Sequence, residues 1–190
     1  MQGVDRLLDA IGRYTKAPSF PAAFSAQVFK IARGEKDERL TFLKVTGGAL
    51  SVKQLLHGAD WEEKADQIRL YSGPKYTLLQ RAEAGTVCAV TGLSHTQAGE
   101  HLGQGKGAAS PLLAPVLEYR MHVDTGDVQG AYLKLRRLEE EDPQLHLVWD
   151  HQLREIRVQL MGPVQMEILQ KLIAKRFALS VSFDEGNIVY

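Results

Sequence analysis

Apolar and polar positions follow two different patterns along the chain, which predicts two domains of different architecture. Between 22 and 107, apolar residues come in short extended runs that Gly, Pro and charged residues separate. These runs lie at 24–31, 40–45, 49–52, 67–71, 76–80 and 86–91. Short strands at regular spacing with turns of this kind favour a small β barrel.

The second half of the chain changes to the order strand, helix, strand, strand, helix, strand. Its first strand is expected at 116–123. The later strands carry apolar residues at alternate positions: Leu145, Leu147 and Trp149; Ile156, Val158 and Leu160; Leu179, Val181 and Phe183. Such alternation places the apolar side chains on one face of a sheet. This order predicts an α+β ferredoxin-like domain of the split βαβ type, following the barrel.

Two helices are expected in this half. Asp127 can cap the first helix, and Pro143 ends it. The apolar stripe of this helix consists of Val128, Ala131, Tyr132, Leu135 and Leu138. The second helix follows Gly162-Pro163, because proline suits the first helical turn. Its predicted inward face consists of Val164, Ile168, Leu172 and Ile173.

A short helix is also predicted near the start of the chain. Val4, Leu7, Leu8 and Ile11 recur at helical spacing and form one apolar stripe. Pro18 and Pro21 prevent the helix from continuing. An isolated helix of about a dozen residues is marginal in water. We therefore expect the stripe to dock on the next domain or on a domain absent from this chain.

Glycine content marks the boundary between the two domains. Four glycines, Gly99, Gly103, Gly105 and Gly107, precede Pro111 and Pro115. This composition predicts a flexible linker over 99–110 that allows the domains to rotate.

The predicted organisation is therefore an N-terminal helix at 1–18, a barrel at 19–105 and a ferredoxin-like domain at 106–190. The apolar end at 188–190 suggests that the chain is a fragment of a longer protein. The alternative is a terminal strand that packs into the sheet.

Composition and charge restrict the class of protein. Lys and Arg number 23, as do Asp and Glu, so bulk charge does not indicate a nucleic-acid binder and any RNA contact must be local. No apolar run is long enough to cross a bilayer, and Asp5 and Arg6 interrupt the first apolar stretch, so we expect neither a membrane span nor a signal peptide. The single cysteine, Cys88, lies in an apolar run, which indicates a packed thiol and a reducing cytoplasm.

Three basic residues flank a predicted hairpin turn. Arg33, Lys36 and Arg39 suit contacts with the phosphates of an RNA. The alternative is a solvated turn, because Glu35, Asp37 and Glu38 lie alongside.

An acidic cluster ends the first helix of the second domain. Carboxylates at a helix C-terminus oppose the helix dipole, although Arg136 and Arg137 precede Glu140 and Glu141 by four residues. One interpretation is a salt-bridged helix end. The other is a docking point for another domain or another protein, formed by Glu140, Glu141 and Asp142 together with Gln165 at the start of the second helix.

The sequence predicts no catalytic residues. The nearest candidate for a phosphate-binding loop is 103–107, but Glu100 stands at the position of the first glycine and Gly107 at that of the hydroxyl. The stretch 92–96 lacks the last glycine of a nucleophile elbow, since Thr96 stands there. We therefore expect this chain neither to bind nor to hydrolyse GTP.

Metal binding is also not expected. His146, Asp150 and His151 lie close together in sequence. Solvent-facing positions opposite the apolar side of a strand explain them better than a metal site does.

Several short sequence motifs resemble domains II and III of elongation factor G and its relatives. Those of domain II lie at 29–31, 39–50, 84–93 and 99–103, and those of domain III at 111–118 and 140–143. The stretch 3–11 resembles the last helix of the GTP-binding domain. The resemblance therefore covers nearly the whole chain in family order. The motif Val164-Gln165-Met166-Glu167 is similar to the corresponding motif of the tetracycline-resistance ribosomal protection proteins.

The resemblance implies a middle fragment of a ribosome-binding translation GTPase. It implies a cytoplasmic, monomeric protein that releases tetracycline from the ribosome, with GTP and magnesium bound only by the full-length GTPase. The implied partners are small-subunit RNA and protein, the missing GTP-binding domain and further C-terminal domains, but no membrane. The alternatives are a fragment of elongation factor G itself, which drives translocation, and a stand-alone module that binds RNA or protein.

Overall fold

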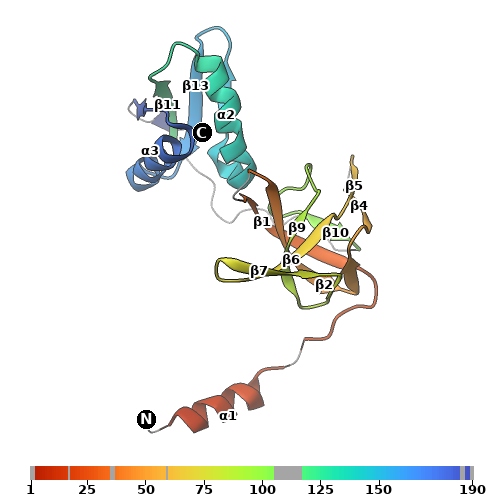
Figure 1. The fold of residues 1–190 in the computed structure, drawn as a ribbon. Coiled ribbons are helices and arrows are strands. Elements are labelled where there is room, and N and C mark those ends of the chain that lie inside the picture. Colours follow the sequence, from red (N-terminus) through yellow and green to blue (C-terminus); the bar gives the residue numbers. More distant parts are fainter. Residues whose placement is uncertain are drawn as a thin grey trace.

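A computed structural model describes residues 3–16, 18–34, 37–58, 60–104, 117–184 and 187–188. Within these ranges the chain forms an N-terminal helix, a β domain and an α+β domain (Figure 1). No helix of the described ranges has the length and apolar character needed to cross a membrane.

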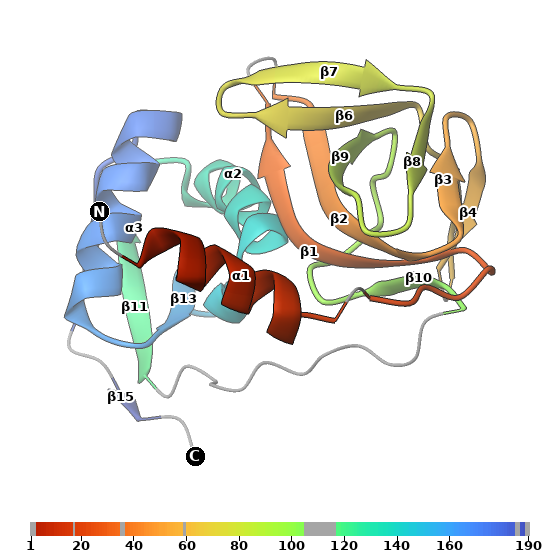
Figure 2. The ribbon, with the colours of Figure 1, turned by 90° about the horizontal axis from the view of Figure 1, so that it is seen from below.

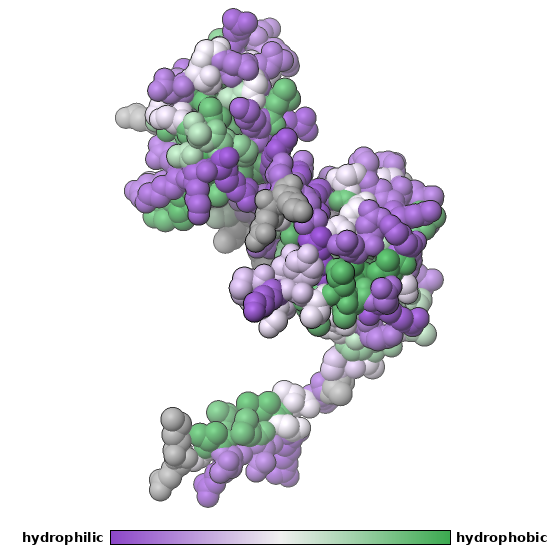
Figure 3. Space-filling model, viewed as in Figure 1, coloured by the Kyte–Doolittle hydropathy of each residue, from purple (hydrophilic) through white to green (hydrophobic). Residues whose placement is uncertain are grey.

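Helix α1 (Val4–Tyr14) projects away from both domains (Figure 1). It buries none of its residues, and its apolar stripe of Val4, Leu7, Leu8 and Ile11 is exposed. The apolar side of the helix is visible as a green strip in Figure 3. The predicted helix is therefore present, but its stripe does not dock on the next domain.

The β domain is built on one antiparallel sheet with the strand order β10-β1-β2-β9-β6-β7, which curls around its core (Figure 2). Two further pairs, β3 with β8 and β4 with β5, complete the domain. The strands are β1 (Ser25–Arg33), β2 (Arg39–Gly47), β3 (Ala49–Ser51), β4 (Leu55–His57), β5 (Glu62–Lys64), β6 (Gln67–Ser72), β7 (Lys75–Leu79), β8 (Arg81–Glu83), β9 (Val87–Thr91) and β10 (His101–Gly103).

Alternate residues of these strands fill the core of the β domain. The fully buried aliphatic side chains include Val28, Ile31, Leu43, Ile68 and Leu102. The Cys88 thiol packs among them, and burial raises its pKa to about 11. The expectation of a packed thiol is therefore confirmed.

The α+β domain has the element order β11-α2-β12-β13-α3-β14, and its sheet has the antiparallel order β12-β13-β11-β14. Both helices pack on the same face of the sheet (Figures 1 and 2), where Leu135, Ile156 and Ile173 are fully buried. The elements are β11 (Leu117–Val123), α2 (Val128–Glu141), a 3₁₀ turn (Pro143–Leu145), β12 (Val148–Asp150), β13 (Glu155–Leu160), α3 (Pro163–Phe177), β14 (Val181–Phe183) and β15 (Asn187–Ile188), which pairs with β11.

Asp127 caps α2 as predicted, because its carboxylate accepts a hydrogen bond from the Gly130 amide at 2.8 Å. The predicted strand at 145–149 is shorter than expected, since residues 143–145 form the 3₁₀ turn instead. Leu145 and Leu147 are nevertheless buried on the apolar face.

Two expectations about the second half of the chain were wrong in part. Of the predicted inward face of α3, Ile173 is buried and Leu172 packs against the core, but Val164 and Ile168 are 72% and 61% exposed. Leu169 is the other buried residue of this helix. The proposed linker also begins too early, because 101–103 form β10 and pair with β1. Backbone pairing in a sheet holds these residues in place regardless of their glycine content. The rest of the predicted linker, from residue 105 onward, lies outside the described residues.

Candidate functional site

The two domains meet where the β1–β2 turn approaches the C-terminal end of α2. Glu140 accepts hydrogen bonds from Arg33 Nη2 at 2.6 Å and from Arg39 Nε at 3.4 Å. In the opposite sense, Arg137 Nη1 of the helix donates to Asp37 Oδ2 of the turn at 2.7 Å. We call these five residues the interdomain clasp. It joins two segments that the sequence separates by about a hundred residues.

Arg39 is the buried end of the clasp. Its Nη1 donates to the Leu93 carbonyl and the Thr96 hydroxyl, both at 2.8 Å, and its Nη2 donates to the Thr96 carbonyl. Burial lowers the pKa of Arg39, and the nearby Glu140 carboxylate opposes that effect. Each guanidinium nitrogen of Arg39 therefore has a protein acceptor.

Arg33 is held less completely. Its Nη1 donates to the Asp37 carbonyl at 3.2 Å and its Nη2 to Glu140. Its Nε is buried and has no hydrogen-bond partner in the structure. Of the two arginines, Arg33 is the one that keeps donor capacity.

The four residues of the predicted docking point do not share one role. Glu140 contacts the β domain, whereas Glu141 pairs with Arg176 of α3 at 2.7 Å. Asp142 accepts from the Gln144 amide, and Gln165 accepts from the Met161 amide. Lys36 lies outside the described residues.

The acidic end of α2 is compensated by tertiary contacts. The sequence suggested ion pairs within the helix, from Arg136 and Arg137 to Glu140 and Glu141. The structure instead pairs Arg137 with Asp37, Glu140 with Arg33, and Glu141 with Arg176. Each partner comes from another element, so the helix end depends on its neighbours for charge balance.

A cavity of about 260 Å³ lies beside the clasp, between β1 and the helical layer of the second domain. Glu141, Asp142 and Gln165 line its polar edge, and Lys30 and Ile31 contribute from β1. Ile168, which the sequence analysis placed in the core, lines this cavity instead.

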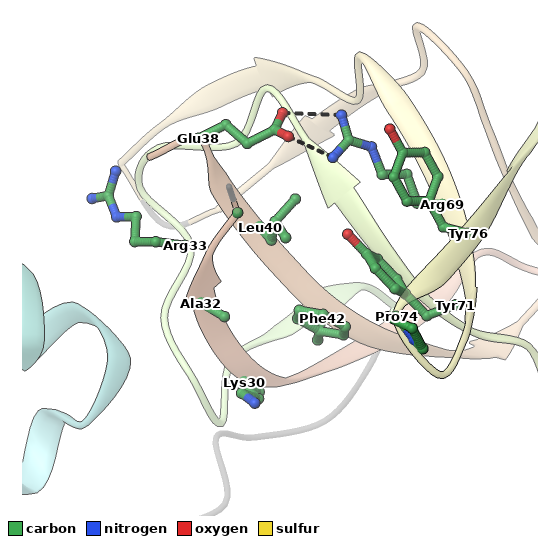
Figure 4. Close-up of a pocket in the computed structure, with 11 residues that line it drawn as sticks. Lys30, Ala32, Arg33, Glu38, Leu40, Phe42, Arg69, Tyr71, Pro74 and Tyr76 are labelled. Carbon is green, nitrogen blue, oxygen red and sulfur yellow. Dashed lines mark hydrogen bonds and ion pairs between the residues drawn. The ribbon is translucent and has the colours of Figure 1, made fainter. Parts of the chain in front are cut away.

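A second pocket, of about 500 Å³, opens on the surface formed by β1, β2, β6 and β7 (Figure 4). Phe42, Tyr71 and Tyr76 line it, with Lys30 and Arg33 at one side. Arg69 forms a two-bond ion pair with Glu38, at 2.6 and 3.0 Å, and this hydrogen bonding raises the pKa of Arg69. The sequence analysis missed this pocket. The sequence feature that could have indicated it is the pair Tyr71 and Tyr76 on either side of the Gly73-Pro74 turn.

Glu63 ties the loop after β9 to β5. It accepts hydrogen bonds from the Ser94 amide and hydroxyl and from the His95 amide and ring. Burial of Glu63 opposes its ionisation, but these hydrogen bonds outweigh it and lower its pKa to about 2. The Ser94 hydroxyl donates to this carboxylate, so the Ser-His-Glu group forms a loop anchor.

His146, Asp150 and His151 do not form a metal site. Across the described ranges, no group of three or more His, Cys, Asp or Glu side chains is placed to hold a metal ion. His151 instead accepts from the Trp149 indole at 3.1 Å, and Asp150 accepts from the amides of Gln152 and Leu153.

Comparisons with known proteins agree with this architecture. A family model described as elongation factor G domain 2 matches residues 23–105. Tetracycline resistance protein TetP of Clostridium perfringens is 30% identical, over 99% of this chain and 30% of that protein. The oxytetracycline resistance protein of Streptomyces rimosus is 28% identical, over 99% of this chain and 31% of that protein. Elongation factor G 2 of Syntrophus aciditrophicus is 26% identical, over 93% of this chain and 27% of that protein.

A crystal structure of a protein from Thermus thermophilus has the same fold, with a TM-score of 0.78 at 22% identity. The match covers 96% of this chain and 29% of that one. The chain thus spans about 30% of the length of the curated relatives that it matches. The resemblance to the elongation factor G superfamily is confirmed: residues 23–105 match the model of elongation factor G domain 2, and the chain is similar to elongation factor G and tetracycline resistance proteins over nearly its whole length.

Proposed function

We propose that this chain is the ribosome-docking and transmission part of a translation GTPase that protects ribosomes from tetracycline. The β domain would contact small-subunit RNA and protein, and the α+β domain, which we assign to the ferredoxin-like class from its strand order, would pass movement to neighbouring domains. The GTP-binding domain, with GTP and magnesium, would belong to the rest of such a protein, which would act as a monomer in the cytoplasm.

The interdomain clasp carries this proposal. A transmission element needs two packed bodies joined by a contact that can exchange partners, and here each domain has its own core. The contact consists of ion pairs, with Glu140 41% exposed, so solvent and ions reach it. Exposed ion pairs of this kind contribute only about 0.2–1 kcal/mol each, so a competing anion can replace one.

A phosphate of ribosomal RNA is the competing anion that we propose. Arg33 Nη2 donates to the half-exposed Glu140 carboxylate, and the guanidinium can bind a phosphate in place of that carboxylate. Docking would then loosen the clasp and allow the domains to rotate about their connection. Arg39, whose two Nη atoms donate within the β domain, would position the turn, and Lys36 would add a further phosphate contact.

Tetracycline protection rather than translocation is proposed because two tetracycline resistance proteins match over 99% of the chain. A chimera tests this choice. The matching segment of TetP is replaced either by this chain or by the corresponding segment of elongation factor G 2 of Syntrophus aciditrophicus. Cells that express each chimera are then scored for growth in tetracycline.

We expect resistance with this chain and none with the elongation factor segment. Ribosome-stimulated GTP hydrolysis by each chimera serves as the folding control. If both chimeras hydrolyse GTP and neither protects, the role in tetracycline release is wrong, and translocation becomes the better proposal. Translocation has support of its own, since elongation factor G 2 of Streptomyces coelicolor is 27% identical over the whole chain.

A further inference from the structure

Four aromatic rings form a continuous row across the surface of the β domain. The ring centroids lie 6.3 Å apart for Phe29 and Phe42, 5.6 Å for Phe42 and Tyr71, and 5.3 Å for Tyr71 and Tyr76. We call these four residues the aromatic row. It begins on β1, continues on β2 and β6, and ends on β7. Phe42, Tyr71 and Tyr76 of this row line the pocket of about 500 Å³ in Figure 4.

The two ends of the row are open to solvent. Phe29 is 49% exposed and Tyr76 is 46% exposed, although aromatic side chains gain most from burial. A row of rings that a fold leaves exposed and side by side is a surface suited to stacking with a planar partner.

Cationic groups lie over the same rings. The Arg69 guanidinium carbon is 4.6 Å from the centroid of Tyr76, and Lys30 Nζ is 5.7 Å from that of Phe42. Together with Arg33, these groups give the pocket lining three cationic side chains against one carboxylate, that of Glu38. The combination of ring faces and positive charge matches a ligand that is both planar and anionic.

The site is held in place before any ligand arrives. Arg69 is fixed by the two-bond ion pair with Glu38 and by Gln67, at 2.8 Å from Arg69 Nη2. Tyr71 and Tyr76 are directly opposite each other in the β6–β7 hairpin, so backbone pairing sets their spacing. Little side-chain freedom remains to be lost on binding, which favours affinity.

We propose that the aromatic row binds an unpaired nucleotide of an RNA strand, with the base stacked along Tyr76, Tyr71 and Phe42 and the phosphate near Lys30 and Arg33. This rests on the proposed function, because ribosomal RNA is the expected source of that nucleotide. An unpaired nucleotide is specified because bases within a duplex already stack on one another and do not expose their faces. A proline-rich peptide is the other ligand that an aromatic groove can bind. Such a peptide has no phosphate to pair with the cationic side chains of this pocket.

Fluorescence anisotropy tests the proposal with a labelled single-stranded RNA heptamer of mixed sequence and the 190-residue chain. Tyr76→Ala is expected to weaken binding by about 5-fold to 100-fold, since each base stacked on an aromatic ring contributes in this range. Tyr76→Trp keeps a ring and is expected to bind as tightly as the unchanged chain. Tyr14→Ala, at an exposed tyrosine on α1 far from the pocket, is the matched control and is expected to have no effect.

Several results would overturn the proposal. One is an affinity of the Tyr76→Ala variant within about two-fold of the unchanged chain, with circular dichroism showing that it is folded. Another is equal binding of a duplex RNA of the same sequence. A third is a proline-rich decapeptide whose binding depends on Tyr76 while that of the heptamer does not.

Co-sedimentation of the same variants with small ribosomal subunits separates this proposal from the proposed function. If the chain sediments with the subunits but Tyr76→Ala does not change the affinity for the heptamer, the proposed nucleotide site is wrong and ribosome docking stands. If the heptamer depends on Tyr76 but the chain does not sediment with ribosomal subunits, the RNA site stands and the proposed function is wrong.

Discussion

Glu140 and Arg33 lie 107 residues apart in the chain, yet their side chains meet at 2.6 Å. Glu140 lies in the last turn of the first helix of the α+β domain, and Arg33 ends the first strand of the β domain. Each belongs to a group of residues that the sequence singled out for contacts with other molecules. The structure brings the two groups together, so that they bind each other within the chain.

Removing the Glu140 charge is expected to loosen the two domains. Spin labels at Lys75→Cys and Lys134→Cys report the interdomain distance, and the buried Cys88 with its raised pKa stays unlabelled. Glu140→Gln is expected to broaden the distance distribution, as is raising the salt concentration. Glu167→Gln, at an exposed glutamate of α3, is the control. Identical distributions for all variants would show that packing alone sets the domain arrangement.

Glu63 is expected to make stability depend on pH. Its folded pKa of about 2 lies below its usual 4.5, so its contribution is full above pH 4.5 and is lost as the pH falls from 4.5 towards 2. Glu63→Gln is expected to cost about 2 kcal/mol at pH 7, and the difference from the unchanged chain should shrink below pH 4.5. Urea denaturation at several pH values measures it. Glu62→Gln, on the same strand, is the control. If the difference in unfolding free energy between Glu63→Gln and the unchanged chain does not vary with pH, the lowered pKa of Glu63 is wrong.

The core of the α+β domain is expected to be sensitive to Leu135. This side chain is fully buried against β13 and α3, so Leu135→Ala should cost about 2–5 kcal/mol. Leu133→Ala on the same helix changes a side chain that is 60% exposed, and a cost of about 0.5 kcal/mol or less is expected. Hydrogen exchange of the β13 amides reports the stability of this domain. Equal effects of the two substitutions would mean that α2 packs through another face.

Gly103 is expected to be irreplaceable within β10. Its φ of +75° favours glycine, and an added Cβ would lie 2.3 Å from the Phe24 carbonyl oxygen. Gly73 also has a positive φ, +60°, but open space surrounds it. Gly73→Ala is therefore expected to cost about 1 kcal/mol from backbone strain alone. Gly103→Ala should cost at least about 1 kcal/mol more in thermal or urea unfolding, because the added methyl group also meets the backbone. Equal costs would show that the strand shifts to make room.

The local pattern of the sequence predicted most of the elements but not all of their faces. Short extended apolar runs between turn residues located β1, β2, β6, β7 and β9. Alternation located β13, because a strand with one buried face needs an apolar residue at every second position. The short strands β4, β5 and β8 were missed, since three residues are too few to show a period. The face of α3 was misjudged in part, because Val164 and Ile168 fit a helical stripe with Ile173 as well as Leu169 does.

The candidate site shows the same division. The basic turn and the acidic helix end were visible as charge runs, and the sequence left open whether solvent or a partner neutralises them. Their contact depends on the placement of one domain against the other, which no local pattern encodes. The aromatic row was invisible for a similar reason: its rings come from strands that are neighbours only in the folded sheet.

By itself, the sequence determined the elements, the apolar cores and the resemblance to elongation factor G, because periodicity, turn residues and characteristic words are local properties of the chain. Only the tertiary structure decided that Arg33 binds Glu140, that β10 joins the sheet and that Phe42, Tyr71 and Tyr76 share a surface. Each of these contacts joins elements that become neighbours only on folding, and strand register and domain packing, rather than local preference, set the distance between them.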